Sequence, residues 1–224
     1  MGKLSGMTKV LSLGGRFTRS LLRDCKGLAL LEFAFTLPIV LLMCLGGAEL
    51  ANYTITRMRV SQIALHIADN AARMGEGPQM AAKTISEVAI GDVFIGAHLQ
   101  SGRLDLKGKG RVILSDLEPI ANPNSSNKYK IAWQRCYGDR VHASSFGRQG
   151  DTDLDGIGPA DQQVTAQDDN ATMFVEVYYV YTPLIENDFM PNHEMVEIAS
   201  MPVRDRRNLE AGIDNSAGVP RLEC

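Results

Sequence analysis

Residues 21–50 read LLRDCKGLALLEFAFTLPIVLLMCLGGAEL, and this stretch decides the fold of the chain. It places the acidic residue Glu32 inside an apolar run that begins directly after Gly27. The 23 residues from Leu28 to Leu50 are enough, at about 1.5 Å per helical residue, to cross a hydrocarbon core of about 30 Å. A carboxylate near the bilayer core costs about 2.5 to 3.5 kcal/mol on insertion scales, so we expect Glu32 to meet a cation.

The residues before this run are strongly basic, and they predict its orientation. Residues 1–27 contain six Lys and Arg residues and a single acidic residue, Asp24. Positive charge beside a first apolar segment is usually retained in the cytoplasm, so we expect the chain after residue 51 to lie outside. A cleaved secretory signal is the alternative, although its apolar core is usually only about 7 to 15 residues long. Helical spacing continues far beyond the apolar run, which favours a retained anchor.

The spacing of Gly27 and Glu32 resembles the class III signal of type IV pilins and pseudopilins. In that family a membrane aspartyl peptidase, the prepilin peptidase, cuts after the Gly. The resemblance therefore implies processing between Gly27 and Leu28. Cleavage would create an α-amino cation on Leu28, which Glu32 of a neighbouring subunit would neutralise within the membrane.

Within that superfamily, Leu30–Pro38 (LLEFAFTLP) is similar to the TadE-like branch. A second similarity, to the end of TadE-like proteins, lies at Ala171–Pro183 (ATMFVEVYYVYTP) and Met201–Arg207 (MPVRDRR). Residues 76–165 resemble no family that we name. The implied leader is long at 27 residues, and Met7 is a second candidate start.

Charge is unevenly distributed along the sequence. The 224 residues carry a formal net charge of −3, whereas the chain after residue 27 has 17 basic and 25 acidic residues, a net charge of −8. Phosphate binding relies on clustered Lys and Arg, so this acidity argues against nucleic acid as a partner of the exported part. The length and the 45% share of hydrophobic residues suit one membrane segment and one soluble domain of about 150 residues.

Three regions follow from these patterns. We expect a cleaved basic leader over residues 1–27 and one long helix over residues 28–75, transmembrane in its first half and a stalk in its second. Residues 76–224 then form a periplasmic or extracellular head. The predicted fold class is α+β, with a small antiparallel sheet beside the long helix, as in pilins.

The head itself shows a change of period. We expect a shorter helix within residues 79–99, ending near Gly91 or Gly96, and a loop or insertion at about 138–170. Alternation of polar and apolar residues predicts four antiparallel strands, at Arg111–Ile120, Lys128–Tyr137, Met173–Pro183 and Glu194–Val203.

The four cysteines fall into two groups on this topology. Cys25 leaves with the leader, and Cys44 lies in the membrane run. Cys136 and Cys224 remain in the exported head, where an oxidising envelope favours a disulfide between them. Two free thiols are the alternative, because sequence alone does not supply the geometry of a bond.

Asp151, Asp153, Asp155 and Gly156 (DTDLDG) match the opening of an EF-hand-type calcium loop. In such a loop alternate carboxylates converge on a hard cation, and the Gly permits a sharp turn. Position twelve of the template is Gln162 rather than the bidentate Glu, which weakens the match. A solvated acidic turn is the alternative to a calcium site.

No catalytic set emerges from the remaining residues, and we expect no enzymatic activity. The four histidines show no metal-ligand spacing, and the glycines form no phosphate-binding loop. Arg204, Arg206 and Arg207 are expected on a solvated edge, with pairing to acidic residues of a neighbouring subunit as the alternative.

The sequence therefore favours a TadE-like pseudopilin or minor pilin that takes part in assembly or initiation of tight-adherence (Flp-type) pili. Its expected partners are the prepilin peptidase, other pilin and pseudopilin subunits and the pilus assembly platform. Its expected location is the bacterial inner membrane, in a single pass with a cytoplasmic N-terminus, and incorporation into a surface pilus stays open. The alternative is a membrane-anchored envelope binding module with calcium or carbohydrate as ligand, and a tethered hydrolase is the weakest reading.

Overall fold

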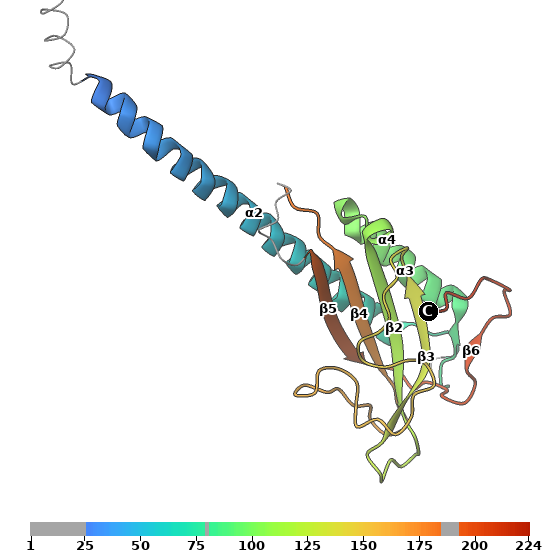
Figure 1. Ribbon diagram of the computed structural model, residues 1–224. Helices are drawn as coiled ribbons and strands as arrows, with labels where there is room; N and C mark the ends of the chain where they lie inside the picture. Colours follow the sequence, from blue (N-terminus) through green and yellow to red (C-terminus); the bar gives the residue numbers. More distant parts are fainter. Residues whose placement is uncertain (1–25, 79–80, 185–192) are drawn as a thin grey trace, which may run out of the picture. The chain divides into compact units, whose positions relative to one another are not determined.

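The computed structural model in Figure 1 describes most of the chain, namely residues 26–78, 81–184 and 193–224. The expected leader lies outside the described residues except for its last two positions, and so do Cys25 and both candidate start residues. Contacts between residues divide the chain into a first unit that ends at Leu50 and a second unit, Ala51–Cys224.

Helix α2, Lys26–Arg73, is one α-helix, as the sequence predicts. Pro38 lies inside it, and because proline has no backbone N–H the carbonyl of Ala34 loses its partner four residues ahead. The helix ends two residues before the expected boundary. Gly75 follows with φ 135°, a conformation that side chains with a Cβ rarely adopt.

Four antiparallel strands form the sheet of the head, in the order β3-β2-β4-β5. Their bounds are β2 Gly110–Pro119, β3 Tyr129–Tyr137, β4 Thr172–Val180 and β5 Glu194–Pro202. These bounds agree closely with the four expected strands, so the predicted α+β class with a small antiparallel sheet is confirmed. A short parallel pair joins β1 Ile85–Ser86 to β6 Ile213–Asp214. Strands this short leave no period in a sequence.

Helix α3, Glu87–Ser101, begins within the expected range and ends later than the sequence predicts. Its start is fixed by Ser86, whose side-chain oxygen accepts a backbone N–H of the first turn at 3.2 Å. The helix passes through Gly91 and Gly96, because buried apolar residues on either side of them hold it against the core. It ends at Gly102, whose φ is 52°. Two short helices follow, η1 Gly102–Leu104 and α4 Leu106–Lys109.

The main core lies between one face of the sheet and the helices. The second half of α2 buries the apolar residues whose spacing predicted it, namely Val60, Ile63, Ala64, Ile67 and Ala71. The other elements contribute Ile90, Phe94 and Ala97 from α3, and Val112, Leu114, Val175 and Val177 from β2 and β4. Each large side chain buried in this way contributes about 1.5 to 3 kcal/mol, so the helix and sheet depend on one another for stability.

The expected insertion, residues 138–170, packs on the opposite face of the sheet. It has no long helix or strand, and two isolated bridges order its course, Tyr129 with Leu154 and Ile157 with Val164. A second apolar cluster lies beneath it, formed by Leu117, Tyr129, Ile131, Ile157, Ala166 and Phe174. The insertion therefore adds a third layer to the head.

A buried carboxylate anchors the start of this insertion. Glu176 of β4 is 1% exposed. Its oxygens accept hydrogen bonds from the hydroxyl of Ser144 at 2.9 Å and from the backbone N–H of Ser145 at 3.1 Å. The ring of His142 lies 3.2 Å away and stacks on Tyr178. Several partners for one carboxylate explain how a charge is accommodated on a buried sheet face.

Cys136, near the end of β3, and Cys224 are joined by a disulfide across 88 positions of the sequence. The backbone N–H of Cys136 also donates to the carbonyl oxygen of Leu222 at 2.7 Å. The two bonds together hold the C-terminal segment beside β3. Cys44 in α2 is free and exposed.

We expect loss of this disulfide to destabilise the head. Replacing both Cys136 and Cys224 with Ser should lower the free energy of unfolding by about 4 kcal/mol, because the unfolded chain regains the entropy of a long open loop. Denaturant unfolding followed by fluorescence of Trp133, which is the single tryptophan, measures the change. Cys44→Ser is the matched control and should unfold like the parent protein. Equal stability of the double variant and the control would contradict the assignment.

Candidate functional site

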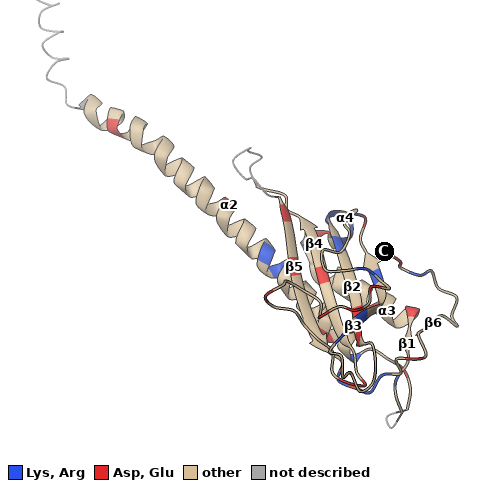
Figure 2. Ribbon diagram, turned by 60° about the horizontal axis from the view of Figure 1, so that its bottom comes forward, with Lys and Arg blue, Asp and Glu red and all other residues tan. Residues whose placement is uncertain are grey.

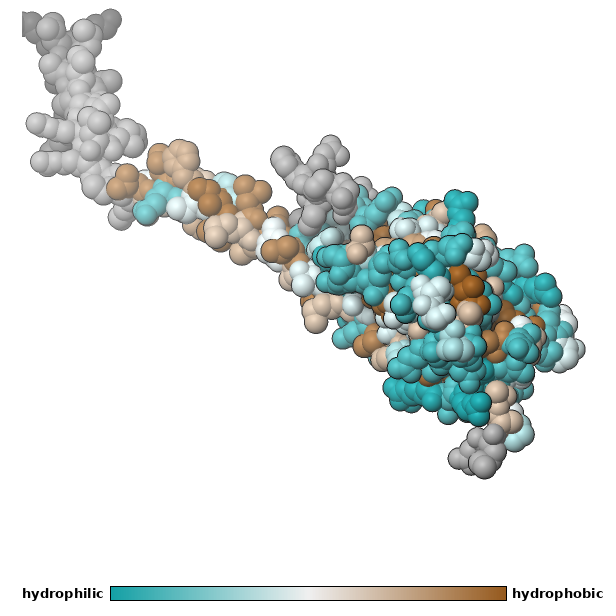
Figure 3. Space-filling model, turned by 90° about the horizontal axis from the view of Figure 1, so that it is seen from below, coloured by the Kyte–Doolittle hydropathy of each residue, from teal (hydrophilic) through white to brown (hydrophobic). Residues whose placement is uncertain are grey.

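The N-terminal half of α2 exposes an apolar surface. Every residue from Gly27 to Ala48 is exposed within the described chain. Figure 3 shows hydrophobic residues along this part of the helix, and in Figure 2 it is almost free of charged positions, unlike the head. Among the described residues, α2 is the helix that is long and apolar enough to cross a membrane. An apolar surface of this size is unfavourable in water and is stabilised when lipid or other helices cover it.

Glu32 lies on this surface without a partner of its own. Its side chain is exposed, and within the described residues no hydrogen bond or ion pair reaches its carboxylate. The hydroxyl of Thr36, one turn further on, donates to the backbone carbonyl oxygens of Glu32 at 3.0 Å and Phe33 at 3.3 Å. It therefore does not donate to the Glu32 carboxylate. The carboxylate is therefore available to a group from outside this chain.

Gly27 and Leu28 lie in the first turn of α2, which begins at Lys26. Backbone N–H groups of a first turn have no acceptor within the helix. A Cβ added at Gly27 would meet nothing within 4 Å, and the side chain of Leu28 is 69% exposed. The peptide bond between Gly27 and Leu28 is therefore not covered by the part of the chain that the structure describes.

The three aspartates of the expected calcium loop lie in the insertion, and two of them bind protein groups. An Asp151 oxygen accepts the backbone N–H of Arg148 at 2.8 Å, and Asp155 pairs with Lys128 at 2.6 Å. Asp153 has φ 59° in the turn between them. In the described parts of the chain, no three His, Cys, Asp or Glu residues are grouped so that they could hold a metal ion. Calcium binding stays a prediction.

Comparison with known families assigns the segment that carries Gly27 and Glu32. Residues 27–75 match the family model of TadE-like proteins. The match begins at the glycine of the expected processing site and covers α2 to just beyond its end. Searches of curated proteins and of solved structures found no match. The TadE-like segment supports involvement in Tad, or Flp-type, pilus systems.

The segment after β5 fastens the head to the end of the TadE-like segment. Its arginines were expected on a solvated edge, and for Arg207 this is wrong, because its side chain is buried. Arg207 donates to the carbonyl oxygens of Ala71 at 3.3 Å and Met74 at 2.9 Å, and Arg204 pairs with Asp69 at 2.9 Å. Helix C-termini leave such carbonyls unpaired, so an arginine here caps α2.

Arg206 is exposed, 3.5 Å from Asp169. The expected similarity of residues 201–207 to the TadE-like family lies outside the match and stays a prediction.

A polar cavity opens where the head covers this helix end. Its volume is about 450 Å³, and its lining includes Trp133, Glu118 and Arg207. Asp116 also lines it, and both of its carboxylate oxygens are buried with no hydrogen-bond partner among the residues that the structure describes. Burial raises the pKa of the Asp116 carboxyl well above its usual range, and the neighbouring Glu118 raises it further. Burial also lowers the pKa of Arg207, although Asp116 and Glu118 oppose this.

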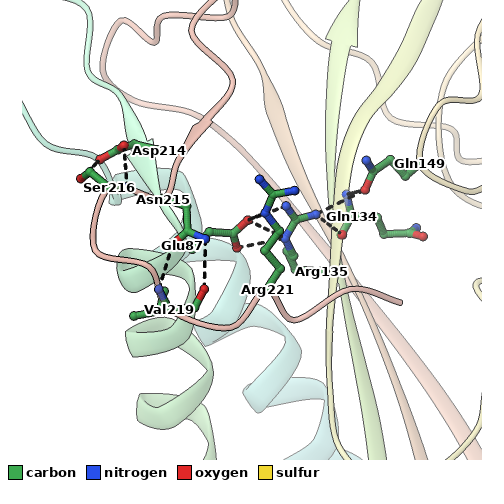
Figure 4. A network of polar contacts seen from close by, with 9 residues as sticks. All are labelled: Glu87, Gln134, Arg135, Gln149, Asp214, Asn215, Ser216, Val219 and Arg221. Atoms are coloured by element: carbon green, nitrogen blue, oxygen red, sulfur yellow. Dashed lines mark hydrogen bonds and ion pairs between the residues drawn. The ribbon is translucent and has the colours of Figure 1, made fainter.

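A bidentate ion pair forms another wall of the cavity. Arg135 donates from Nε to Glu87 Oε2 at 3.0 Å and from Nη2 to Oε1 at 2.6 Å, with both side chains buried (Figure 4). Arg221 approaches the same carboxylate at 3.9 Å from the C-terminal segment. Glu87 lies in the first turn of α3, where the helix dipole favours a negative charge. The pair therefore joins α3 to β3 and matches the geometry that charged pairs need when buried.

We expect the buried Asp116 to make the stability of the head fall as pH rises. An aspartate with a raised pKa in the folded state binds its proton more tightly there than in the unfolded state. Its stabilising contribution is complete below pH ~4 and is lost as pH rises through the folded pKa. Asp116→Asn should remove this loss and be more stable than the parent at pH 8 by about 1 to 3 kcal/mol.

Denaturant unfolding between pH 4.5 and pH 8, followed by Trp133 fluorescence, tests this. Asp161→Asn, at an exposed position, is the control and should track the parent at every pH. If the difference between Asp116→Asn and the parent did not grow with pH, the carboxyl would be ionised in the folded protein.

Sequence reasoning singled out Gly27 and Glu32 of the apolar helix and missed the residues of the head cavity. Asp116, Glu87 and Arg135 stand in three different elements of otherwise ordinary pattern and form no motif. One signal was present in the sequence, since Asp116 interrupts an apolar alternation in β2 at a position that faces the helices. Nothing in the sequence shows that Arg207 meets the end of α2, because that contact spans more than 130 positions.

Proposed function

We propose that this protein is a TadE-like pseudopilin, or minor pilin, that takes part in assembly or initiation of Tad (Flp-type) pili. The observation that carries the proposal is Glu32, a carboxylate with no partner among the described residues, on an exposed apolar helix within a segment that matches TadE-like proteins. A simple anchor gains nothing from such a charge, which membrane insertion penalises. In an assembly of subunits, the carboxylate can pair with a cation of a neighbouring chain.

The mechanism is an ion pair that processing creates. A prepilin peptidase cuts between Gly27 and Leu28, and the new α-amino group of Leu28 is largely protonated at neutral pH, since such groups have pKa values of about 7.7 to 8. Glu32 of an adjacent subunit then accepts this cation. In a medium of low dielectric constant each charge strongly favours the other, so the pair forms only when helices lie side by side in the correct register.

The topology of this proposal places the leader in the cytoplasm and the head in the periplasm, with α2 crossing the inner membrane once. The basic residues of the leader support this orientation. The partners are the prepilin peptidase, other pilin or pseudopilin subunits and the assembly platform, and the acidic head has no affinity for nucleic acid. The role is interaction, with no reaction catalysed.

We expect the mature protein to begin at Leu28. N-terminal sequencing of the protein from cells that contain the peptidase checks this directly. Gly27→Val should block processing and leave a slower-migrating precursor, and because a Cβ at Gly27 meets nothing within 4 Å, the helix itself should tolerate the change. Gly47→Ala, at an equally open glycine, is the control and should be processed normally. A mature start elsewhere, or normal processing of Gly27→Val, would contradict the assigned site.

We expect Glu32→Gln to be processed normally but to assemble poorly. The variant keeps the shape and loses the charge, so the α-amino cation of the neighbouring subunit is left unpaired. An unpaired buried charge costs about 3 to 5 kcal/mol, so pilus-associated protein should fall at least about tenfold.

The measurement is the ratio of sheared-pilus or assembly-complex protein to total mature protein. Thr36→Val is the matched control, because it lies one turn away and its hydroxyl donates to backbone carbonyl oxygens of the preceding turn, not to the Glu32 carboxylate. Normal assembly with Glu32→Gln would show that no cation depends on this carboxylate.

A further inference from the structure

The second half of α2 carries an apolar stripe that its own head does not bury. The large apolar residues exposed in this part of the helix are Ile55, Met58 and Leu65, with exposed fractions of 49%, 58% and 47%. Together with Ala51 and Gln62, which are also exposed, they recur at intervals of four, three, four and three residues. Residues spaced in this way lie on one side of a helix, because one turn takes 3.6 residues. These five residues form what we call the outer stripe.

The outer stripe lies opposite the helix face that packs on the sheet. Val60, Ile63 and Ile67 belong to the buried core of the head. At about 100° per residue, Met58 lies about 160° around the helix from Val60, and Leu65 lies about 140° from it. Within the described residues, the head therefore covers one side of α2 and leaves the stripe on the other side open.

Lipid is not the cover of this stripe on the topology proposed above. The stripe follows the apolar run, which ends at residue 50, and the sequence between its members contains Arg57 and Arg59. Both arginines are exposed, and Arg57 pairs with Glu197 of β5 at 2.6 Å. Charged side chains are costly in hydrocarbon, so this part of α2 lies in water beyond the bilayer core. An apolar stripe in that position is stabilised by contact with protein.

The spacing of the stripe selects a second helix as the partner. Apolar residues that are alternately three and four apart occupy the a and d positions of a coiled coil. Ile55 and Gln62 take the a positions, and Ala51, Met58 and Leu65 take the d positions. A β-branched residue at a combined with Leu at d favours two parallel helices, and one polar residue at an a position fixes their register.

We propose that the outer stripe is the contact surface of a parallel dimer, in which α2 of a second copy of this chain packs in register against it. Identical residues then face each other across the two-fold axis. Gln62 meets Gln62, and each side-chain amide has both a donor and an acceptor for the other. Met58 and Leu65 pack on their own counterparts. The inference goes beyond the proposed function, because it needs a membrane-anchored helix but no processing.

Two identical copies fit this surface without repulsion. Residues at g of one helix flank residues at e of the other. Thr54 therefore lies beside Arg59, and Ser61 lies beside His66, which is held by a hydrogen bond to Gln100 at 2.9 Å. The two copies of Arg59 do not meet. Both heads lie on the outer sides of the helix pair, and a shared membrane topology keeps the helices parallel.

The membrane is part of this dimer. Two heptads supply few side chains, whereas a stable interface between soluble proteins usually buries about 800 Å² on each partner. Anchoring both helices in one bilayer raises the effective concentration of each for the other. We therefore expect the dimer in membranes, where the test has to be made.

Oxidative cross-linking of the full chain in cell membranes tests the dimer. Cys44 is free and precedes Ala51 by seven residues, so it takes the next d position, and oxidation should link two copies through it. In a Cys44→Ser background, Met58→Cys and Leu65→Cys should each restore the linked dimer. Asn70→Cys, exposed but away from the stripe, is the control and should not. Two copies with different tags, expressed together, show whether the linked species contains this chain twice.

A charge at the polar layer gives a second test. In the Leu65→Cys variant, Gln62→Glu should lower the linked fraction at least about tenfold, because two carboxylates then face each other and such a juxtaposition costs several kcal/mol. Gln62→Leu should keep the link. Asn70→Asp adds the same charge outside the stripe and is the matched control. Trp133 fluorescence shows that the head of each variant is folded.

The proposal is overturned by any of four results: no link through positions 44, 58 and 65, a link to a different protein, equal linking at position 70, or a Gln62→Glu variant that links like its parent. Processing and dimer formation are read separately, since the unprocessed Gly27→Val precursor should link as well as the parent. A start at Leu28 without a dimer removes the outer-stripe contact alone. A dimer in a protein that is not cut after Gly27 keeps the contact and removes the pseudopilin function.

Discussion

The packing of the second half of α2 against the sheet is the constraint on which the head depends. Residues at helical spacing from Val60 to Ala71 are buried there, and the small side chains of Ala64 and Ala71 let helix and strands approach closely. Because one face of the sheet and one face of the helix are each unstable in water alone, neither element persists without the other. The long helix therefore exposes different kinds of surface along its length. Its first part exposes apolar residues on all sides, as a lipid environment requires, and its second part exposes only one face.

The polar interior of the head follows from that packing. Where α2 ends, its carbonyl groups need donors, and Arg207 supplies them from a distant segment. A buried cation in turn favours carboxylates nearby, and Asp116 and Glu118 lie close enough to affect its pKa. The Glu87–Arg135 pair and the disulfide of Cys136 then fix α3 and the C-terminal segment against β3. The insertion and the C-terminal segment also bond to β3 and cover that edge of the sheet.

Much of the fold could be predicted because its elements have strong local periods. The four strands alternate, and the buried face of α2 repeats at helical spacing, so their positions agreed with the structure to within a few residues. The predicted end of α3 was wrong, because helix propensity at Gly91 and Gly96 was given more weight than burial of Ile90, Phe94 and Ala97 around them. The insertion at 138–170 was expected as a loop, and its packing as a third layer depends on apolar residues too widely spaced to form a pattern.

The sequence by itself determined the part of the protein that acts through local chemistry: an apolar helix, a glycine five positions before a carboxylate, and a basic segment ahead of them. These features can be recognised without any tertiary contact, because membrane insertion depends on the hydrophobicity and charge of a single segment. Long-range contacts, in contrast, make Arg207 a buried cap rather than a surface residue and place Asp116 at a cavity. Each of these depends on which distant segments meet, and the energy of such meetings comes from the burial of whole surfaces, which no short stretch of sequence encodes.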